Sequence, residues 1–195
     1  MSKLRSFSAP AHVIVAGANG GIGSAFVDTL LDDPRVGYIT ALSRRPLDRQ
    51  HERLRSVTVD FADEASIAKA AADCGDNIDL VIVATGVLHR DPDIRPEKRL
   101  ADIDGQVMAE VLRINTIGPA LLAKHFLPLL RRDAKSAFAA ISARVGSISD
   151  NWLGGWASYR ASKAALNMLM RTFSIEQSRT NPGSLVVTLH PGTTD

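Results

Sequence analysis

The segment Tyr159-Arg160-Ala161-Ser162-Lys163 contains the two side chains of this chain that are best suited to chemistry. On a helix, Tyr159 and Lys163 are four residues apart and project from one face. An ammonium group beside a phenol favours the phenolate and lowers a pKa that is ordinarily about 10. The spacing predicts a tyrosine that can act as an acid or a base near neutral pH. An exposed helix face is the usual alternative for such a pair, so the assignment depends on the other motifs.

A glycine-rich turn, Gly17-Ala18-Asn19-Gly20-Gly21-Ile22-Gly23, follows the first expected strand. Glycines at positions 17, 21 and 23 permit a tight turn and a close approach of the backbone to a ligand. The N-terminus of the helix that follows attracts a pyrophosphate. A plain structural turn is the alternative, but the position between a strand and a helix favours dinucleotide binding.

A proline lies inside a helical stretch, in Ile114-Asn115-Thr116-Ile117-Gly118-Pro119. Because Pro119 has no N–H, the carbonyl of Asn115, four residues earlier, receives no helical hydrogen bond. A free carbonyl in a kinked helix can hold an ordered water beside a site. A structural kink without a role is the alternative.

Strand-like and helix-like segments alternate along the chain, which predicts an α/β fold with a doubly wound parallel sheet, the Rossmann fold. We expect six strands with helices on both faces, in a single domain over residues 12–195 that follows a flexible arm over residues 1–11. The expected strands are His12–Ala16, Tyr38–Ser43, Val57–Val59, Asp79–Ala84, Ala137–Ser142 and Leu185–His190, and the expected helices are Gly21–Leu31, Ala65–Asp73, Ala101–Leu130 and Ala157–Arg179.

The composition excludes several classes of protein. A net charge of +2 over 195 residues gives no basis for nucleic-acid binding. No apolar run approaches the ~20 residues that span a bilayer. Cys74 is the only cysteine and the five histidines show no ligand spacing, so we expect no metal site. A cytoplasmic location is the default expectation.

The order and spacing of these motifs resemble the short-chain dehydrogenase/reductase family over about residues 13–194. Segments 96–98, 118–124 and 146–151 are most similar to its bacterial C-factor-like branch, which is related to sniffer-type carbonyl reductases. The resemblance implies an NAD(P)-dependent oxidoreductase acting on a small carbonyl or alcohol. It implies that Tyr159 exchanges a proton with the substrate oxygen, that Lys163 lowers the pKa of Tyr159 and binds the nicotinamide ribose, and that Asn115 holds a relay water.

The second strand ends at Ser43-Arg44-Arg45, where NAD enzymes place a carboxylate that binds the adenosine ribose. An arginine fork suits a phosphate dianion, so NADP is favoured over NAD, although two solvated arginines are the alternative. By resemblance, the cofactor-binding residues are Gly17, Asn19, Gly21, Ile22, Gly23, Ser43, Arg44, Asp60, Phe61, Ala84, Gly86, Tyr159, Lys163, Pro191, Gly192 and Thr193.

The serine that the family places after its fifth strand falls on Ala143 in this chain, counting back from Gly146. Ser142 is the expected replacement, and the resemblance implies that this serine orients the substrate carbonyl. Ser147 is the second candidate. Side chains of a strand alternate between its faces, so Ser142 needs a bulge to be aimed at the site.

A nucleotide-binding signalling or regulatory protein of the C-factor-like kind, with weak or no catalysis, is the alternative function. Ala143 favours it, as does the chain's end at Asp195, where relatives continue into a substrate-covering lid and a seventh strand. We therefore expect a domain without that lid and a weakly active form. A homodimer or homotetramer is expected from apolar side chains beyond those that one sheet face needs, namely Leu121, Leu122, Phe126, Leu166 and Leu169.

Overall fold

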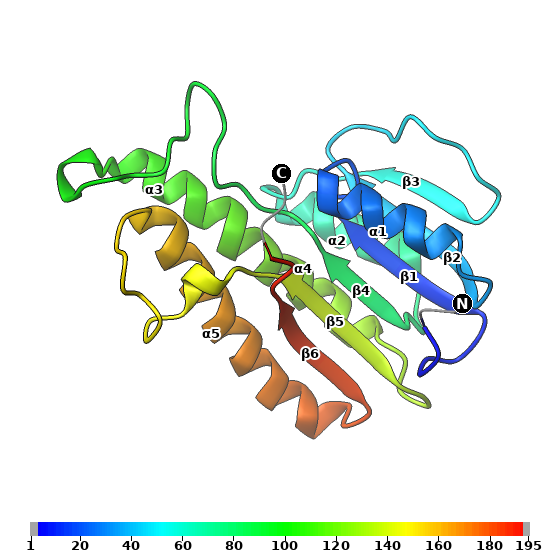
Figure 1. Cartoon of the computed structure of the whole chain (residues 1–195). Coiled ribbons are helices and arrows are strands. Elements are labelled where there is room, and N and C mark those ends of the chain that lie inside the picture. Colours follow the sequence, from blue (N-terminus) through cyan, green and yellow to red (C-terminus); the bar gives the residue numbers. More distant parts are fainter. Residues whose placement is uncertain (1–3, 193–195) are drawn as a thin grey trace.

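A computed structural model describes residues 4–192 of the chain. Six parallel strands form one sheet in the order β3-β2-β1-β4-β5-β6, which confirms the expected doubly wound fold (Figure 1). The strands are β1 (Ala11–Ala16), β2 (Val36–Ser43), β3 (Leu54–Thr58), β4 (Leu80–Val83), β5 (Ser136–Ile141) and β6 (Ser184–Leu189). The helices are α1 (Gly21–Leu31), α2 (Glu64–Cys74), α3 (Gly105–Leu112), α4 (Gly118–Phe126) and α5 (Ala157–Thr180).

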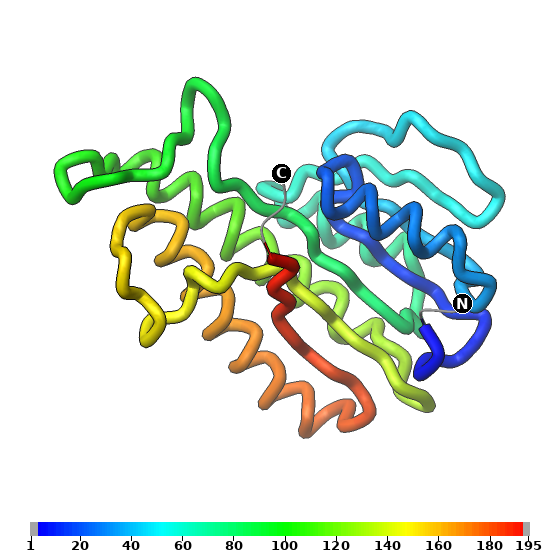
Figure 2. The backbone as a smooth tube through the Cα atoms, in the orientation of Figure 1, coloured from blue at the N-terminus to red at the C-terminus, as the bar shows by residue number. Residues whose placement is uncertain are grey.

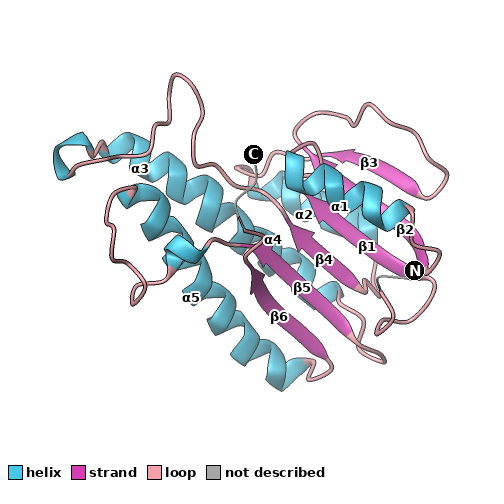
Figure 3. Ribbon diagram, in the orientation of Figure 1, coloured by secondary structure: helices cyan, strands magenta, loops and turns pink. Residues whose placement is uncertain are grey.

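Helices cover both faces of the sheet and produce two apolar cores (Figure 3). On one face, Val27 and Leu30 of α1 pack on Val13 and Val15 of β1. On the other face, α2, α4 and α5 pack over alternate residues of the same strands, with Phe138 of β5 among the largest buried side chains. Successive side chains of a strand point to opposite faces, so the strands in the middle of the sheet are apolar on both sides.

The strand order reverses between β1 and β4, and the carboxyl ends of all six parallel strands meet at one edge (Figure 2). The glycine turn leaves β1 there, and the loops after β2, β4 and β5 leave the same edge. A ligand of an open α/β sheet binds in the crevice at such a reversal. The fold therefore gathers most of the predicted site residues at one edge.

The expected helical stretch over Ala101–Leu130 is helical from Gly105 to Leu129, and it departs from the regular α-helix inside and at both ends. A 3₁₀ turn at Leu100–Asp102 precedes α3, a π turn at Arg113–Ile117 joins α3 to α4, and a second 3₁₀ turn at Leu127–Leu129 ends the segment. The Asp104 side chain accepts hydrogen bonds from the N–H groups of residues 106 and 107 and so caps the N-terminus of α3. Pro119 lacks the N–H that a regular α-helix would use at the second break.

Residues 4–10, expected to form a flexible arm, pack against the α1 face through Leu4 and Phe7. The Leu4 N–H donates to Asp33 Oδ2 at 3.1 Å, and Arg35 Nη2 donates to the Phe7 carbonyl at 2.6 Å. Sequence analysis missed these contacts because both partners lie after α1, about 30 residues away, with no local pattern that points back to the arm.

Candidate active site

The glycine turn brings the end of β1 against the loop that follows β4. Gly17 has a φ of +84°, and a Cβ atom there would lie 2.9 Å from the backbone of Ala84 and Thr85. A Cβ atom on Gly23 would lie 2.2 Å from the carbonyl oxygen of Gly17. Side chains at these two positions would therefore push the turn away from α1 and from the β4 loop.

A groove of about 1030 Å³ runs along this edge of the sheet. Eight predicted cofactor residues line it, namely Gly17, Asn19, Ser43, Arg44, Asp60, Phe61, Ala84 and Gly86. Gly21, Ile22 and Gly23 form the first turn of α1, and Pro191 and Gly192 follow β6 at the same edge. Thr193 lies outside the described residues. Asn19 Nδ2 donates to the carbonyl of Arg45 at 2.8 Å and so ties the arginine loop to the glycine turn.

Tyr159 and Lys163 lie one turn apart near the start of α5, with Lys163 Nζ 5.8 Å from the centre of the Tyr159 ring. Lys163 is 3% exposed, and its Nζ donates to the carbonyl of Ile141 at 2.8 Å. Burial lowers the pKa of Lys163 to about 8. Burial also raises the pKa of Tyr159 above its ordinary value, so the expected lowering of this pKa is wrong. Desolvation of the phenol outweighs an ammonium group that is bonded elsewhere.

Asn115 joins the β4 loop to α5 through its side chain. The residue is fully buried in the π turn, and its Oδ1 accepts from the Val87 N–H at 2.7 Å. Its Nδ2 donates to the Val87 carbonyl at 2.8 Å and to Ser162 Oγ at 3.0 Å. A Cβ atom on Gly86 would lie 3.4 Å from Lys163 Nζ and 3.5 Å from Asn115 Oδ1. Gly86 therefore marks the place where Asn115, Lys163 and the end of the groove meet.

The two candidate serines point elsewhere. Ser142 Oγ donates to Asn167 Oδ1 at 2.7 Å. Asn167 lies eight residues beyond Tyr159 on α5, about 12 Å along the helix axis. Because the Ser142 hydroxyl donates its hydrogen bond to Asn167, it is not placed to donate to a substrate carbonyl, as the expected role requires. Ser147 Oγ accepts from the Asp150 N–H at 3.3 Å instead.

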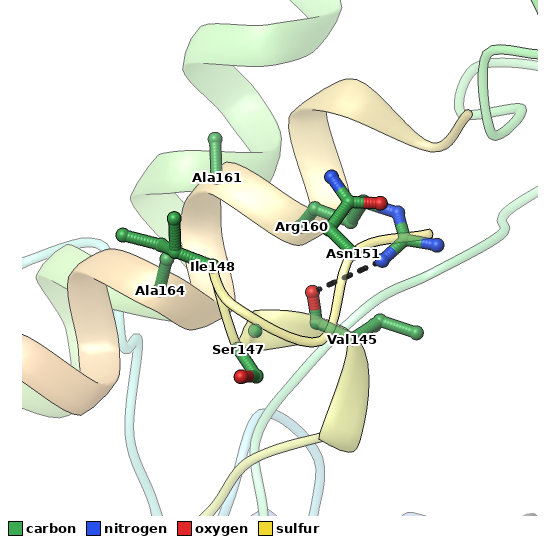
Figure 4. A pocket seen from close by; sticks show the side chains of 8 residues that line it. Val145, Ser147, Ile148, Asn151, Arg160, Ala161 and Ala164 are labelled. Atoms are coloured by element: carbon green, nitrogen blue, oxygen red, sulfur yellow. Dashed lines mark hydrogen bonds between the residues drawn. The ribbon is translucent and has the colours of Figure 1, made fainter. Parts of the chain in front are cut away.

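Ser147 lines a separate cavity of about 190 Å³ between the loop after β5 and the start of α5 (Figure 4). Gly146 also lines this cavity, and a Cβ atom there would lie 2.8 Å from the Cβ of Lys163. Arg160 lines the same cavity, and its Nη1 donates to the Val145 carbonyl at 3.5 Å, as the dashed line in Figure 4 marks.

Sequence analysis missed four polar residues that line the groove near α3, namely His89, Arg90, Glu110 and Arg113. Glu110 forms ion pairs with Arg90 and with Arg113. The one available signal was the position of Arg113, two residues before Asn115.

Residues 11–195 match the family model described as short chain dehydrogenase. The chain belongs to the short-chain dehydrogenase family.

This short-chain dehydrogenase is similar in sequence to two bacterial proteins. The C-signal of Myxococcus xanthus is 41% identical over 93 residues, which are 48% of this chain and 55% of that protein. The 1-hydroxy-2-glutathionyl-2-methyl-3-butene dehydrogenase of Rhodococcus sp. (strain AD45) is 34% identical over 137 residues, 69% of this chain and 56% of that protein. The chain thus spans a little over half the length of these two relatives.

Solved structures of carbonyl reductases are similar to this short-chain dehydrogenase over nearly its whole length. The NADPH-bound carbonyl reductase from chicken fatty liver has a TM-score of 0.82 and 31% identity, covering 98% of this chain and 82% of that one. The carbonyl reductase Sniffer of Caenorhabditis elegans has a TM-score of 0.82 and 28% identity, covering 94% of this chain and 86% of that one. These similarities confirm the resemblance that the motifs indicated.

Two features are absent from residues 4–192, the part of the chain that the structure describes. Within that range, no helix combines the length and the apolar character needed to cross a membrane. In the same range, His, Cys, Asp and Glu side chains do not gather in groups of three or more that could hold a metal ion.

Proposed function

We propose that the chain is an NADP-dependent oxidoreductase that interconverts a small carbonyl compound and its alcohol, with Tyr159 as the acid and base. The observation that carries the proposal is the meeting of Lys163 and Asn115 beside Gly86, at the end of a groove lined by the glycine turn and Arg44. Lys163 Nζ also lies 5.8 Å from the centre of the Tyr159 ring, so it is near both the groove and the proposed proton donor, which hydride transfer to a carbonyl needs close together.

The residues of the groove fit a dinucleotide. Gly17 and Gly23 leave room where any side chain would collide with backbone, and the N-terminus of α1 carries no acidic residue in its first turn. Among the described residues, Thr85 Oγ1 in the groove wall is buried without a hydrogen-bond partner, and a ligand beside it can supply one. The glycine turn would hold the pyrophosphate, Arg44 the 2′-phosphate, and Asp60 and Phe61 the adenine. Bound there, NADP(H) would supply or accept the hydride.

The chain's own residues handle the proton. Because burial raises the pKa of Tyr159, its phenol is protonated at neutral pH and can donate to a carbonyl oxygen. Lys163, with a pKa of about 8, is mostly charged at pH 7 and stabilises the phenolate that the donation leaves. Its bond to the Ile141 carbonyl fixes the ammonium from the side of the sheet. Asn115 keeps the β4 loop closed against α5.

The test is consumption of NADPH by the purified chain against a panel of aldehydes and ketones. Tyr159→Phe keeps the ring and removes the proton donor, so we expect it to abolish turnover while the dissociation constant for NADPH stays nearly unchanged. Turnover of the Phe variant at the wild-type rate would rule out Tyr159 as the acid.

The choice of NADP over NAD has its own test. Arg44 lies on the edge of the groove, so we expect NADPH to bind more tightly than NADH and Arg44→Ala to remove most of the difference. Binding titrations measure both affinities. Equal affinities of the wild-type chain for the two cofactors would contradict the assignment.

A nucleotide-binding signalling or regulatory protein with weak or no turnover is the second candidate. The similarity to a protein named C-signal favours it, and so does Ala143 at the place of the family serine. Binding of NADPH with no consumption against the whole carbonyl panel would select this second function.

A further inference from the structure

Glu97 is a buried acid that the proposed proton transfer does not use. The residue is 5% exposed and lies about 60 residues before α5 in the chain. Its carboxylate nevertheless sits at the N-terminus of α5, where it accepts from the Ser158 N–H at 3.2 Å and from the Ser158 hydroxyl. Its main-chain carbonyl accepts from the Trp156 N–H at 2.6 Å. Glu97 is thus hydrogen-bonded to Ser158 and to Trp156, which lie one and three positions before Tyr159.

The chain enters α5 in a conformation that needs such support. Gly154, Gly155 and Trp156 have φ values of +64°, +67° and +53°, three left-handed residues in a row. A tryptophan rarely adopts this conformation, and it persists only where surrounding contacts determine it. Arg160 supplies part of these contacts, since its guanidinium donates to the carbonyls of Gly154 at 3.1 Å and Gly155 at 2.9 Å. Asn151 Oδ1 accepts from the Gly154 N–H at 3.1 Å, and Glu97 holds Trp156.

Glu97 also replaces a missing helix cap. Trp156 occupies the N-cap position of α5 but its side chain accepts no hydrogen bond from the helix. The carboxylate of Glu97 takes over that role from a distant segment, and its negative charge suits the N-terminus of a helix. The turn that carries Glu97 is itself braced, because the Asp102 carboxylate accepts from the Lys98 N–H at 3.3 Å and the Arg99 N–H at 3.0 Å.

The supported turn of α5 carries the proposed acid. The Trp156 indole meets the Tyr159 ring edge-on, with the ring centres 6.5 Å apart and the planes at 76°. We propose that Glu97 is a positioning residue for Tyr159: by capping α5 and holding Trp156, it fixes the place from which the phenol donates its proton. This inference rests on the proposed function of Tyr159, and it assigns Glu97 no contact with substrate or cofactor.

The experiment compares three variants of the full chain. Glu97→Ala removes the remote cap. Glu97→Gln keeps the shape, with its amide oxygen able to accept from the Ser158 N–H and its amide nitrogen able to donate to the Ser158 hydroxyl. Asp104→Ala is the matched control, because the Asp104 side chain likewise caps a helix, α3, and its hydrogen bonds go to the N–H groups of residues 106 and 107. Each variant is measured for kcat, for KM, for NADPH affinity and for the emission of Trp156 in a Trp152→Phe background, where Trp156 is the only tryptophan.

Misplacement of a reacting group by about 1 Å can cost on the order of 10²-fold in rate, so we expect Glu97→Ala to lower kcat by that order with NADPH affinity retained. Glu97→Gln should recover most of kcat, and Asp104→Ala should keep it. Trp156 is 39% exposed in the folded chain, so we expect its emission to shift further to longer wavelength in Glu97→Ala alone, as the rest of the indole is released to water. A loss of kcat no larger than in Asp104→Ala, or an unchanged Trp156 emission, would overturn the proposal.

If the wild-type chain reduces no carbonyl, the proposed function fails, while the emission still decides whether Glu97 holds Trp156.

Discussion

At the scale of single residues, burial decides the protonation of the two residues that were expected to act together. Tyr159 and Lys163 share a helix face, as their spacing predicts, but both are desolvated and the Lys163 ammonium bonds to the Ile141 carbonyl rather than to the phenol. Burial raises the pKa of the phenol and lowers the pKa of the amine, so each neutral form is favoured. The phenol is therefore set to give a proton at neutral pH, which suits reduction of a carbonyl.

The lowered pKa of Lys163 makes a prediction about stability. Its value of about 8 in the folded chain compares with 10.5 when exposed, so between these two pH values the unfolded chain binds more protons. The free energy of unfolding of the wild type should therefore rise with pH across this window, by up to about 3 kcal/mol. Lys163→Met lacks the amine and should not show this rise. Denaturant unfolding of both proteins from pH 7 to the alkaline limit measures it. Parallel curves for the two proteins would contradict a lowered pKa of Lys163.

At the scale of elements, the glycine turn and α1 agree with the sequence prediction residue for residue, because their signals are local. The helical stretch over Ala101–Leu130 agrees only from Gly105 onward, because the Asp104 cap sets the start of α3 there. A π turn before Pro119 then buries Asn115 within the helical stretch. In that turn the Asn115 side chain bonds to the β4 loop, a contact that the expected free carbonyl did not include.

The structure predicts that alanine substitutions at two glycines of α1, Gly21 and Gly23, have different effects on stability. A Cβ atom on Gly23 would meet the Gly17 carbonyl oxygen at 2.2 Å, whereas one on Gly21 would meet nothing within 4 Å. We expect Gly23→Ala to lower the free energy of unfolding by about 1–3 kcal/mol, as overpacking does, and to weaken NADPH binding. Gly21→Ala, the control for stability, should change it by less than about 1 kcal/mol. Equal stability of the two variants in denaturant unfolding would show that the turn tolerates a side chain at Gly23.

At the scale of the whole molecule, the apolar residues that were expected to form a dimer serve the chain's own core. Leu122, Phe126 and Leu166 are buried between the sheet and the helices, and Leu121 and Leu169 are partly buried against the same core, so these five residues give no evidence of an interface. Two different apolar side chains of α5 are exposed, namely Met168 and Ile175. Met168 is 66% exposed and Ile175 is 43% exposed, and their spacing of seven residues places them on one face.

We still expect at least a dimer, now through that face of α5. Met168→Glu places a charge in the proposed interface and should lower the molar mass toward that of the monomer, because an unpaired charge is costly to bury. Light scattering at micromolar concentration measures the mass of both proteins. A monomeric wild type would contradict the dimer, and a mass unchanged by Met168→Glu would place any interface elsewhere.

The sequence by itself determined the fold class, the order of the strands along the chain, the glycine turn and the Tyr159–Lys163 spacing. Each of these depends on local periodicity or on backbone freedom, which a short stretch of residues already specifies. The sequence also placed eight residues that line the groove, because the carboxyl ends of parallel strands must meet at one edge.

Only the tertiary structure decided which polar groups meet and in what state of charge. The pKa of Tyr159 depends on burial that segments far along the chain create, so residue spacing predicted its direction wrongly. The Ser142 hydroxyl donates to Asn167 of α5, which lies 25 residues further along the chain, and no local pattern encodes that contact. Glu97 reaches α5 across about 60 residues of chain, and its role is visible only once those segments are folded together.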